Sequence, residues 1–172
     1  MFVSAVIVAA GRGRRMGGAV DKIFLEVAQR PIISHTWERF DRAQCVDEIV
    51  LVIREDARGT FEGIASRQGF QKPHRFVIGG AERQDSVVNG VNACDPRTNI
   101  IAIHDGARPC VTEEVLERTI AVARETGAAV TGSMVIDTIK SVNAQGVIDV
   151  HLDRARLRAV QTPQVFHAGR IR

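Results

Sequence analysis

Aromatic side chains are scarce in this 172-residue sequence, which has no tyrosine, one tryptophan and seven phenylalanines. Proteins that hold single-stranded nucleic acid stack bases on aromatic rings, and an aromatic content of 5% leaves few rings for that purpose. The formal net charge is a modest +3 at pH 7. These features argue against a nucleic-acid partner and predict that any anionic ligand is small.

Long apolar runs and paired cysteines are also missing. No stretch approaches the roughly 18 apolar residues of a membrane span, and the apolar run at residues 2–10 has no basic segment before it, unlike a signal peptide. Cys45, Cys94 and Cys110 lie far apart, which fits neither a disulfide framework nor a zinc site. We therefore expect no membrane segment, no metal held by protein ligands, and a reducing, cytoplasmic setting.

The composition that is present suits one globular domain over residues 1–172, with 45% hydrophobic and 25% charged residues. Apolar runs at 3–8, 48–53, 76–78 and 100–103 are typical of strands buried on both faces of a parallel sheet. They alternate with segments of helical spacing at 32–43, 58–68, 83–93 and 113–126. This alternation predicts a three-layer, Rossmann-like α/β fold with a mostly parallel central sheet.

The pattern changes after Ala128, where strand-like segments at 130–142 and 147–150 flank a short loop that ends in Gly146. Such a loop is typical of a hairpin, so we expect a projecting β-hairpin arm over about residues 135–156. An isolated two-stranded hairpin is marginal in water. The arm should therefore pack on a second chain or fold back on its own domain, through the apolar residues Val135, Ile139, Val142 and Ile148.

The first strand leads into a basic, glycine-rich segment at residues 9–18, followed by Asp21 and Lys22. Glycines let the backbone approach phosphate oxygens, and the cations supply the charge that a triphosphate needs. A dinucleotide fingerprint would need glycine at Met16 and a P-loop would need Ser or Thr at Ile23, so both are excluded. A solvated basic loop is the plain alternative, but its place at a strand end favours a nucleotide site.

Two more segments follow strands of the expected sheet. Residues 79–87 hold Gly80 and Ser86, which suit either the edge of a base or a tight turn with a polar first helical turn. Asp105 is placed to bind a metal or a sugar hydroxyl, and Arg108 to bind phosphate. The alternative is that Asp105 caps a loop and pairs with Arg108, while His104 suits a structural role equally well.

Six segments in this order make the sequence resemble the 2-C-methyl-D-erythritol 4-phosphate cytidylyltransferases of the non-mevalonate isoprenoid pathway. The segments are Ala9-Ala10-Gly11-x-Gly13-x-Arg15-Met16 with Lys22, Gly80-x-x-Arg83-x-x-Ser86-Val87, His104-Asp105-x-Ala107-Arg108-Pro109, Asp137-Thr138-x-Lys140, Asp153-Arg154 and Gln161-Thr162-Pro163-Gln164. The resemblance covers nearly the whole chain and implies a nucleotidyltransferase fold. It implies transfer of CMP from CTP to the methylerythritol phosphate, with release of pyrophosphate.

The resemblance also implies the roles of individual residues. Arg15 and Lys22 would be catalytic, stabilising charge on the α-phosphate. The nucleotide would be bound by Ala9, Ala10, Gly11, Gly13, Gly80, Arg83, Ser86 and Ala107. The polyol phosphate would be bound by Asp105, Arg108, Thr138, Arg154 and Thr162.

Further implications concern partners. Mg²⁺ would be held mainly by the CTP phosphates, and the arm would cross a two-fold homodimer so that Thr138 and Arg154 complete the other subunit's site.

The chain departs from the family beside Lys22, where Asp21 and Ile23 replace the usual proline and glutamine. Its end at Arg172 falls short of the family's usual length, so we expect a C-terminally truncated enzyme. A pentitol-phosphate cytidylyltransferase and a non-catalytic nucleotide-binding protein remain the alternatives.

Overall fold

The computed structural model describes residues 1–11 and 21–172 and has a six-stranded central sheet in the order β5-β4-β1-β6-β10-β7. Strands β1, β4, β5 and β6 run parallel, and β10 is antiparallel to both β6 and β7. The mostly parallel α/β sheet expected from the sequence is confirmed. The strands are β1 (Phe2–Val8), β4 (Glu48–Ile53), β5 (His74–Ile78), β6 (Thr98–Asp105), β7 (Ala128–Met134) and β10 (Arg158–His167).

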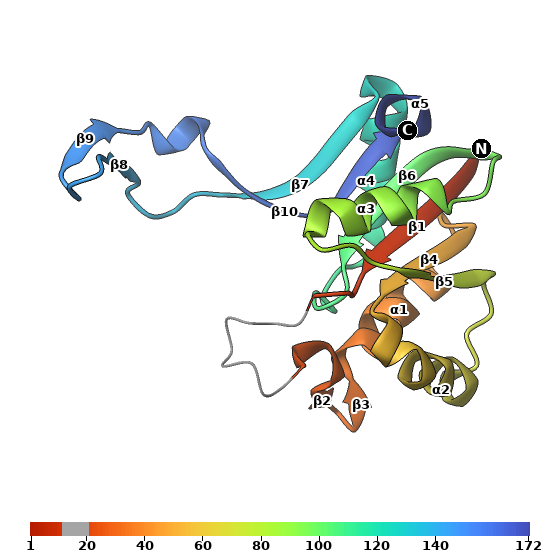
Figure 1. Cartoon of the computed structure of the whole chain (residues 1–172). Coiled ribbons are helices and arrows are strands. Elements are labelled where there is room, and N and C mark those ends of the chain that lie inside the picture. The colour runs from red at the N-terminus through yellow and green to blue at the C-terminus, as the bar shows by residue number, and fades with distance from the viewer. Residues whose placement is uncertain (12–20) are drawn as a thin grey trace.

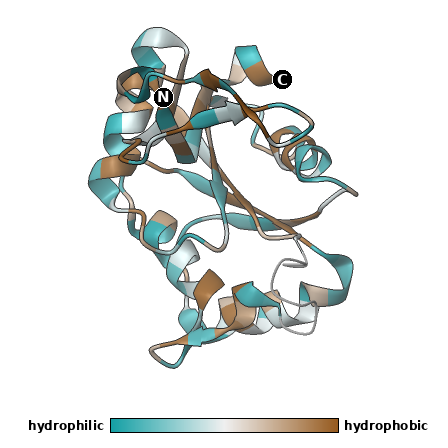
Figure 2. Cartoon of the chain, turned by 90° about the vertical axis from the view of Figure 1, so that its left-hand side faces the viewer, coloured by the Kyte–Doolittle hydropathy of each residue, from teal (hydrophilic) through white to brown (hydrophobic). Residues whose placement is uncertain are grey.

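Helices cover both faces of the sheet, which gives three layers (Figure 1). One face packs against α1, α2 and α4, where Trp37, Phe40 and Phe61 are fully buried. The other face packs against α3 and α5 through Val91 and Ala168. In Figure 2 the helices around the sheet carry both hydrophilic and hydrophobic residues, as expected for helices that bury one side. The helices are α1 (Ile32–Arg42), α2 (Arg58–Gln68), α3 (Arg83–Asn92), α4 (Glu113–Thr126) and α5 (Ala168–Ile171).

Local sequence signals explain where these helices begin and end. The Thr112 hydroxyl accepts a hydrogen bond from Val115 N at 3.3 Å and caps α4, and Gly127 ends that helix with a φ of +87°. Glu82 and Asp85 form a reciprocal capping box at the start of α3. The expected bounds of α1 to α4 therefore hold to within one residue.

Two parts of the fold were not expected from the sequence. Strand β10 contains Pro163, which normally argues against a strand inside a sheet. Its pairing with β7 shifts register between Val160 and Gln164, and this irregularity accommodates the proline. The short ribbon β2 (Glu26–Val27) and β3 (Arg30–Pro31) turns at Ala28 and Gln29, whose φ angles of 49° and 62° are uncommon outside glycine and asparagine.

The arm begins where β7 and β10 stop pairing, at Met134 and Arg158. It projects from the body (Figure 1) and carries the antiparallel strands β8 (Lys140–Val142) and β9 (Ile148–His151), followed by the short helix η4 (Arg154–Arg156). The expectation of one continuous strand over residues 130–142 is wrong, because strand pairing is interrupted between β7 and β8. Of its apolar side chains, Val142 and Ile148 are 56% and 61% exposed.

Candidate active site

The three segments expected to bind the nucleotide and the substrate lie together in the structure. They meet at the side of the sheet where β1, β4, β5 and β6 end, which we call the carboxyl edge. Ala9 N donates to Val52 O at 2.8 Å, and Gly79 N donates to Ile53 O at 2.9 Å. Gly106 N donates to Val8 O at 2.8 Å. These bonds fix the start of all three segments side by side. Ligands of open α/β sheets bind at such an edge.

Close backbone approach explains Gly79, the first of the two paired glycines in the segment at residues 79–87. A Cβ on Gly79 would lie 2.5 Å from Ala10 Cβ and 2.7 Å from Ser86 Oγ, so only glycine fits there. The three residues therefore form one tightly packed group at the carboxyl edge. This group contains Ala10 and Ser86, two of the expected nucleotide-binding residues, and lies next to a third, Gly80.

Ser86 is 3% exposed, and its hydroxyl already has two hydrogen-bond partners. Ser86 Oγ accepts from Gly80 N at 3.1 Å and donates to Glu82 O at 3.2 Å. A hydroxyl has one donor hydrogen and two acceptor lone pairs. As arranged here, Ser86 has only an acceptor position left for a ligand.

Asp105 lies between two arginines. Arg83 Nη2 donates to Asp105 Oδ1 at 2.9 Å, and Arg108 Nε donates to Asp105 Oδ2 at 3.0 Å. Burial alone would raise the pKa of Asp105, but the two guanidinium groups outweigh it and lower the pKa. Thr162 Oγ1 accepts from Asp105 N at 3.4 Å, and Gln161 accepts from Arg108. A carboxylate, two cations and a hydroxyl thus lie together within one chain, supplied by Asp105, Arg83, Arg108 and Thr162.

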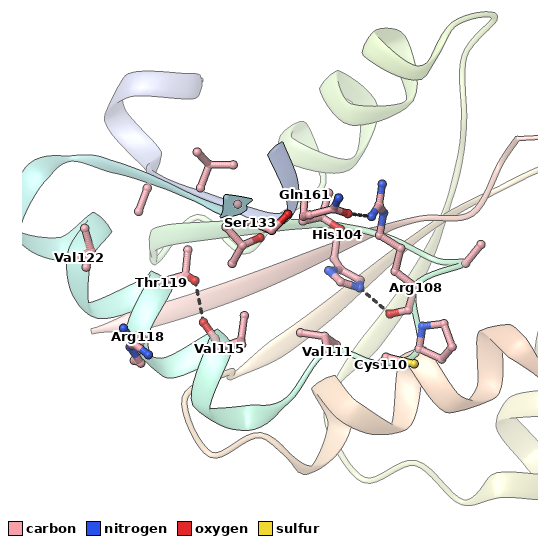
Figure 3. A pocket seen from close by; sticks show the side chains of 17 residues that line it. His104, Arg108, Cys110, Val111, Val115, Arg118, Thr119, Val122, Ser133 and Gln161 are labelled. Carbon is pink, nitrogen blue, oxygen red and sulfur yellow. Dashed lines mark hydrogen bonds between the residues drawn. The ribbon is translucent and has the colours of Figure 1, made fainter. Parts of the chain in front are cut away.

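A pocket of about 800 Å³ adjoins this cluster and is lined by residues of β6, α4, β7 and β10 (Figure 3). His104 is fully buried at its wall, with Nε2 3.0 Å from Arg108 O, so that nitrogen carries the proton. His104 Nδ1 has no partner among the described residues. The ring therefore fixes the backbone of Arg108, the structural role that was one of its two interpretations.

His104 makes stability depend on pH. Burial lowers its pKa below the ordinary value of 6.5, so the unfolded chain binds more protons as the pH falls through that value. This contribution is present above about pH 6.5 and is lost below it. We expect the free energy of unfolding in urea to fall between pH 7.5 and 5.5, and the fall to be smaller in His104→Gln.

The exposed His167 provides the control for that comparison. His167→Gln should keep the pH dependence of the parent chain, because it leaves the buried His104 in place. An equal pH dependence in His104→Gln and the parent would contradict the prediction.

Lys22 begins the short helix η2 (Lys22–Phe24) and is exposed to solvent. Ile23 next to it is 3% exposed and packs into the core, while Asp21 forms an ion pair with Arg54. These contacts account for two residues that depart from the family's pattern. Gly13 and Arg15 lie outside the described residues.

Thr138 lies between β7 and β8 and Arg154 begins η4, so both are on the arm. The arm projects from the body of the protein (Figure 1), which holds Asp105 and Arg108. Arg154 Nη1 donates to Ile136 O at 2.7 Å and ties the two sides of the arm together. One chain therefore does not bring these two expected phosphate-binding residues to the rest of the site.

Among residues 1–11 and 21–172, no group of three or more His, Cys, Asp or Glu side chains could hold a metal ion. No helix in the same ranges has the length and apolar character needed to cross a membrane.

Gln161 and Arg54 had no role assigned from the sequence. Gln161 lies 53 positions from its partner Arg108, and Arg54 is similarly remote from Asp21, so spacing gives no signal. The start of α3 did carry a signal in the sequence, because Glu82 and Asp85 have the three-residue offset of a capping box.

Comparison with known proteins identifies the family. The family model for IspD, 2-C-methyl-D-erythritol 4-phosphate cytidylyltransferase, matches residues 3–172. The chain belongs to the IspD family. Members of this family are cytidylyltransferases, so the expectation of a nucleotidyltransferase is confirmed.

Individual IspD relatives cover nearly all of the chain. The cytidylyltransferase of Syntrophotalea carbinolica is 44% identical over 174 aligned positions, covering 100% of this chain and 74% of the relative. That of Bacillus cytotoxicus is 41% identical over 161 residues, 94% of this chain and 70% of the relative. The 4-diphosphocytidyl-2C-methyl-D-erythritol synthase structure from Anaerococcus prevotii matches with a TM-score of 0.86 at 33% identity, covering 98% of this chain and 70% of that one.

Proposed function

We propose that the chain transfers CMP from CTP to 2-C-methyl-D-erythritol 4-phosphate, releasing pyrophosphate and forming 4-diphosphocytidyl-2-C-methyl-D-erythritol. The observation that carries the proposal is the meeting of the Ala9–Gly11, Gly79–Ser86 and Asp105–Arg108 segments at the carboxyl edge. This edge combines close backbone approach with a polar cluster. Family membership supplies the reaction.

Ser86 supports the choice of cytosine. Its remaining position is an acceptor, which suits the exocyclic amino group of cytosine and does not suit the carbonyl oxygen that uracil has there. Gly79 packs closely against Ala10 and Ser86, so a base held beside Ser86 would lie against the backbone of this segment. Ala9, Gly11, Gly13, Arg83 and Ala107 complete the proposed nucleotide-binding set.

Asp105 and Arg108 support the binding of a polyol phosphate. The lowered pKa keeps Asp105 a carboxylate at neutral pH, so it can accept hydrogen bonds from hydroxyl groups. Arg108 offers a guanidinium for phosphate, and Thr162 offers a hydroxyl that is bonded to the backbone of Asp105. We place Thr138 and Arg154 at the same phosphate, contributed by a second subunit.

The chemistry needs charge and alignment more than a covalent intermediate. A phosphate monoester has a second pKa of about 6, so the attacking group is already largely anionic at neutral pH. Charge that develops on the α-phosphate would be stabilised by Lys22 and Arg15. The described residues offer no cage for Mg²⁺, which is commonly held by substrate phosphates, so we place it on the CTP phosphates.

The exposed apolar residues of the arm support a homodimer. Met134 and Ile136 are 75% and 84% exposed at its base, and Val147 and Ile148 are 60% and 61% exposed at its tip. Such a surface on a thin projection needs a partner to bury it.

We also place the enzyme in the cytoplasm, because Cys45, Cys94 and Cys110 are free thiols. No nucleic-acid partner is proposed.

Pyrophosphate release tests the function directly. With Mg²⁺ and methylerythritol phosphate, CTP should be turned over at least on the order of a hundredfold faster than UTP, ATP or GTP, because mismatched edges leave buried polar groups unpaired. Comparable turnover with ATP would exclude the proposed base site. Replacing the acceptor by a pentitol phosphate distinguishes the alternative enzyme, and binding of CTP without release would identify a non-catalytic protein.

A further inference from the structure

An ion pair ties the segment that carries Lys22 to the end of β4. Arg54 Nη1 lies 2.7 Å from Asp21 Oδ2, and the two side chains are only 18% and 20% exposed. Arg54 Nε also donates to Asp56 Oδ1 at 3.0 Å. The contact between Arg54 and Asp21 is therefore a close charge pair in a poorly solvated place.

Arg54 lies between the two nucleotide-side segments. The residues just before it, Val52 and Ile53, accept hydrogen bonds from Ala9 N and Gly79 N. In the sheet, β4 stands between β1 and β5, so the end of β4 is flanked by the loops that follow both strands. A side chain fixed at this point can set the position of a group that approaches the triphosphate.

The segment on the other side of the ion pair is anchored to the body of the protein. Asp21 O accepts from Phe24 N at 2.9 Å, and Ile23 is buried in the core. Movement of Asp21 would therefore move η2 and Lys22 with it. Burial alone would lower the pKa of Arg54, but the Asp21 and Asp56 carboxylates outweigh it and raise the pKa, in keeping with a guanidinium held by carboxylates.

We propose that Arg54 is a positioning residue for Lys22. It acts on Lys22 indirectly, because it holds the carboxylate of the neighbouring Asp21. The inference rests on the proposed role of Lys22 at the α-phosphate. Asp21 is the immediate neighbour of that lysine and carries the charge that competes with phosphate for it. Removing Arg54 would leave a poorly solvated carboxylate unpaired, and such a group attracts a nearby ammonium and repels an incoming triphosphate.

The test is a double-mutant cycle on kcat and KM for CTP. Arg54→Met should lower kcat about tenfold with a smaller change in KM, because Lys22 is drawn toward Asp21. Asp21→Asn/Arg54→Met should recover to within about threefold of the parent, since the unpaired charge is gone. Arg54→Lys should keep most of the activity.

The matched control is Arg97→Met. It breaks the ion pair of Arg97 with Asp95, 2.8 Å long and placed just before β6 at the opposite edge of the sheet, and should leave both constants unchanged. Equal losses in Arg54→Met and the double variant would overturn the proposal. A rise in KM for CTP in Arg54→Met, with kcat unchanged and no relief from Asp21→Asn, would also overturn the proposal. That result would make Arg54 a direct phosphate ligand.

Lysine acetylation followed by mass spectrometry separates this inference from the proposed function. The chain has three lysines, so Lys72 and Lys140 serve as internal references. Acetylation of Lys22 should be severalfold slower in Arg54→Met and should return to the parent rate in the double variant. If the parent chain releases no pyrophosphate, the proposed function fails while this result can stand. If Lys22 reacts equally in all variants of an active enzyme, the inference fails.

Discussion

Lys22→Ala is expected to lower kcat by on the order of a hundredfold or more, with a smaller effect on KM for CTP. Lys22 lies on η2 at the carboxyl edge, on a segment anchored by the buried Ile23 and the Asp21 ion pair. A cation held in place before the reaction stabilises charge that grows only in the transition state. Its loss therefore affects turnover more than binding.

Lys72→Ala provides the comparison, because Lys72 precedes β5 and lies at the opposite edge of the sheet. This variant should turn over CTP at the parent rate. Steady-state pyrophosphate release measures both, and circular dichroism verifies that each variant is folded. Turnover unchanged by Lys22→Ala would remove Lys22 from the mechanism.

The second large effect is recovery of activity on mixing two inactive variants. Lys22→Ala and Arg154→Ala should each be inactive alone. If Arg154 acts on the partner's substrate, a mixed dimer has one site with both defects and one site with neither. Random mixing makes half of the dimers mixed, so about a quarter of the full activity should return.

The mixing experiment needs its own controls. Differently tagged chains show how much mixed dimer forms, and Thr138→Ala replaces Arg154→Ala in a second series, because Arg154 also bonds Ile136 O within its own arm. Activity that stays absent although mixed dimers form would show that the arm serves its own subunit. A chain that remains monomeric would contradict the homodimer itself.

The parallel half of the fold could be predicted because its signals are local. Strands β1 and β4 are apolar at nearly every position, and β5 and β6 hold apolar runs at residues 76–78 and 100–103. Helix α4 has Thr112 at one end and Gly127 at the other. Strand β10 gave no such signal, since Pro163 and several polar residues interrupt it. Its place in the sheet depends on pairing with β6 and β7, which no local pattern contains.

The residues of the site also divide into those with a local sequence signal and those placed by the tertiary fold. The glycine and serine positions near Gly80 and the segment from Asp105 to Arg108 were recognisable as motifs, because each motif is contiguous in sequence. The ion pair of Arg54 with Asp21 and the bond of Arg108 to Gln161 join segments far apart along the chain. Such pairs depend on the tertiary fold, and a single sequence holds no record of them.

The position of β10 also sets an order of assembly. This strand is formed by residues 158–167 yet separates β6 from β7, so β7 cannot join the sheet before β10 has been synthesised and inserted. Until then the edge of β6 presents unpaired backbone groups, which invite pairing with other chains. Late, non-local strand pairing is also slow. During synthesis, the half-built sheet is therefore the stage at which this enzyme is most exposed to aggregation.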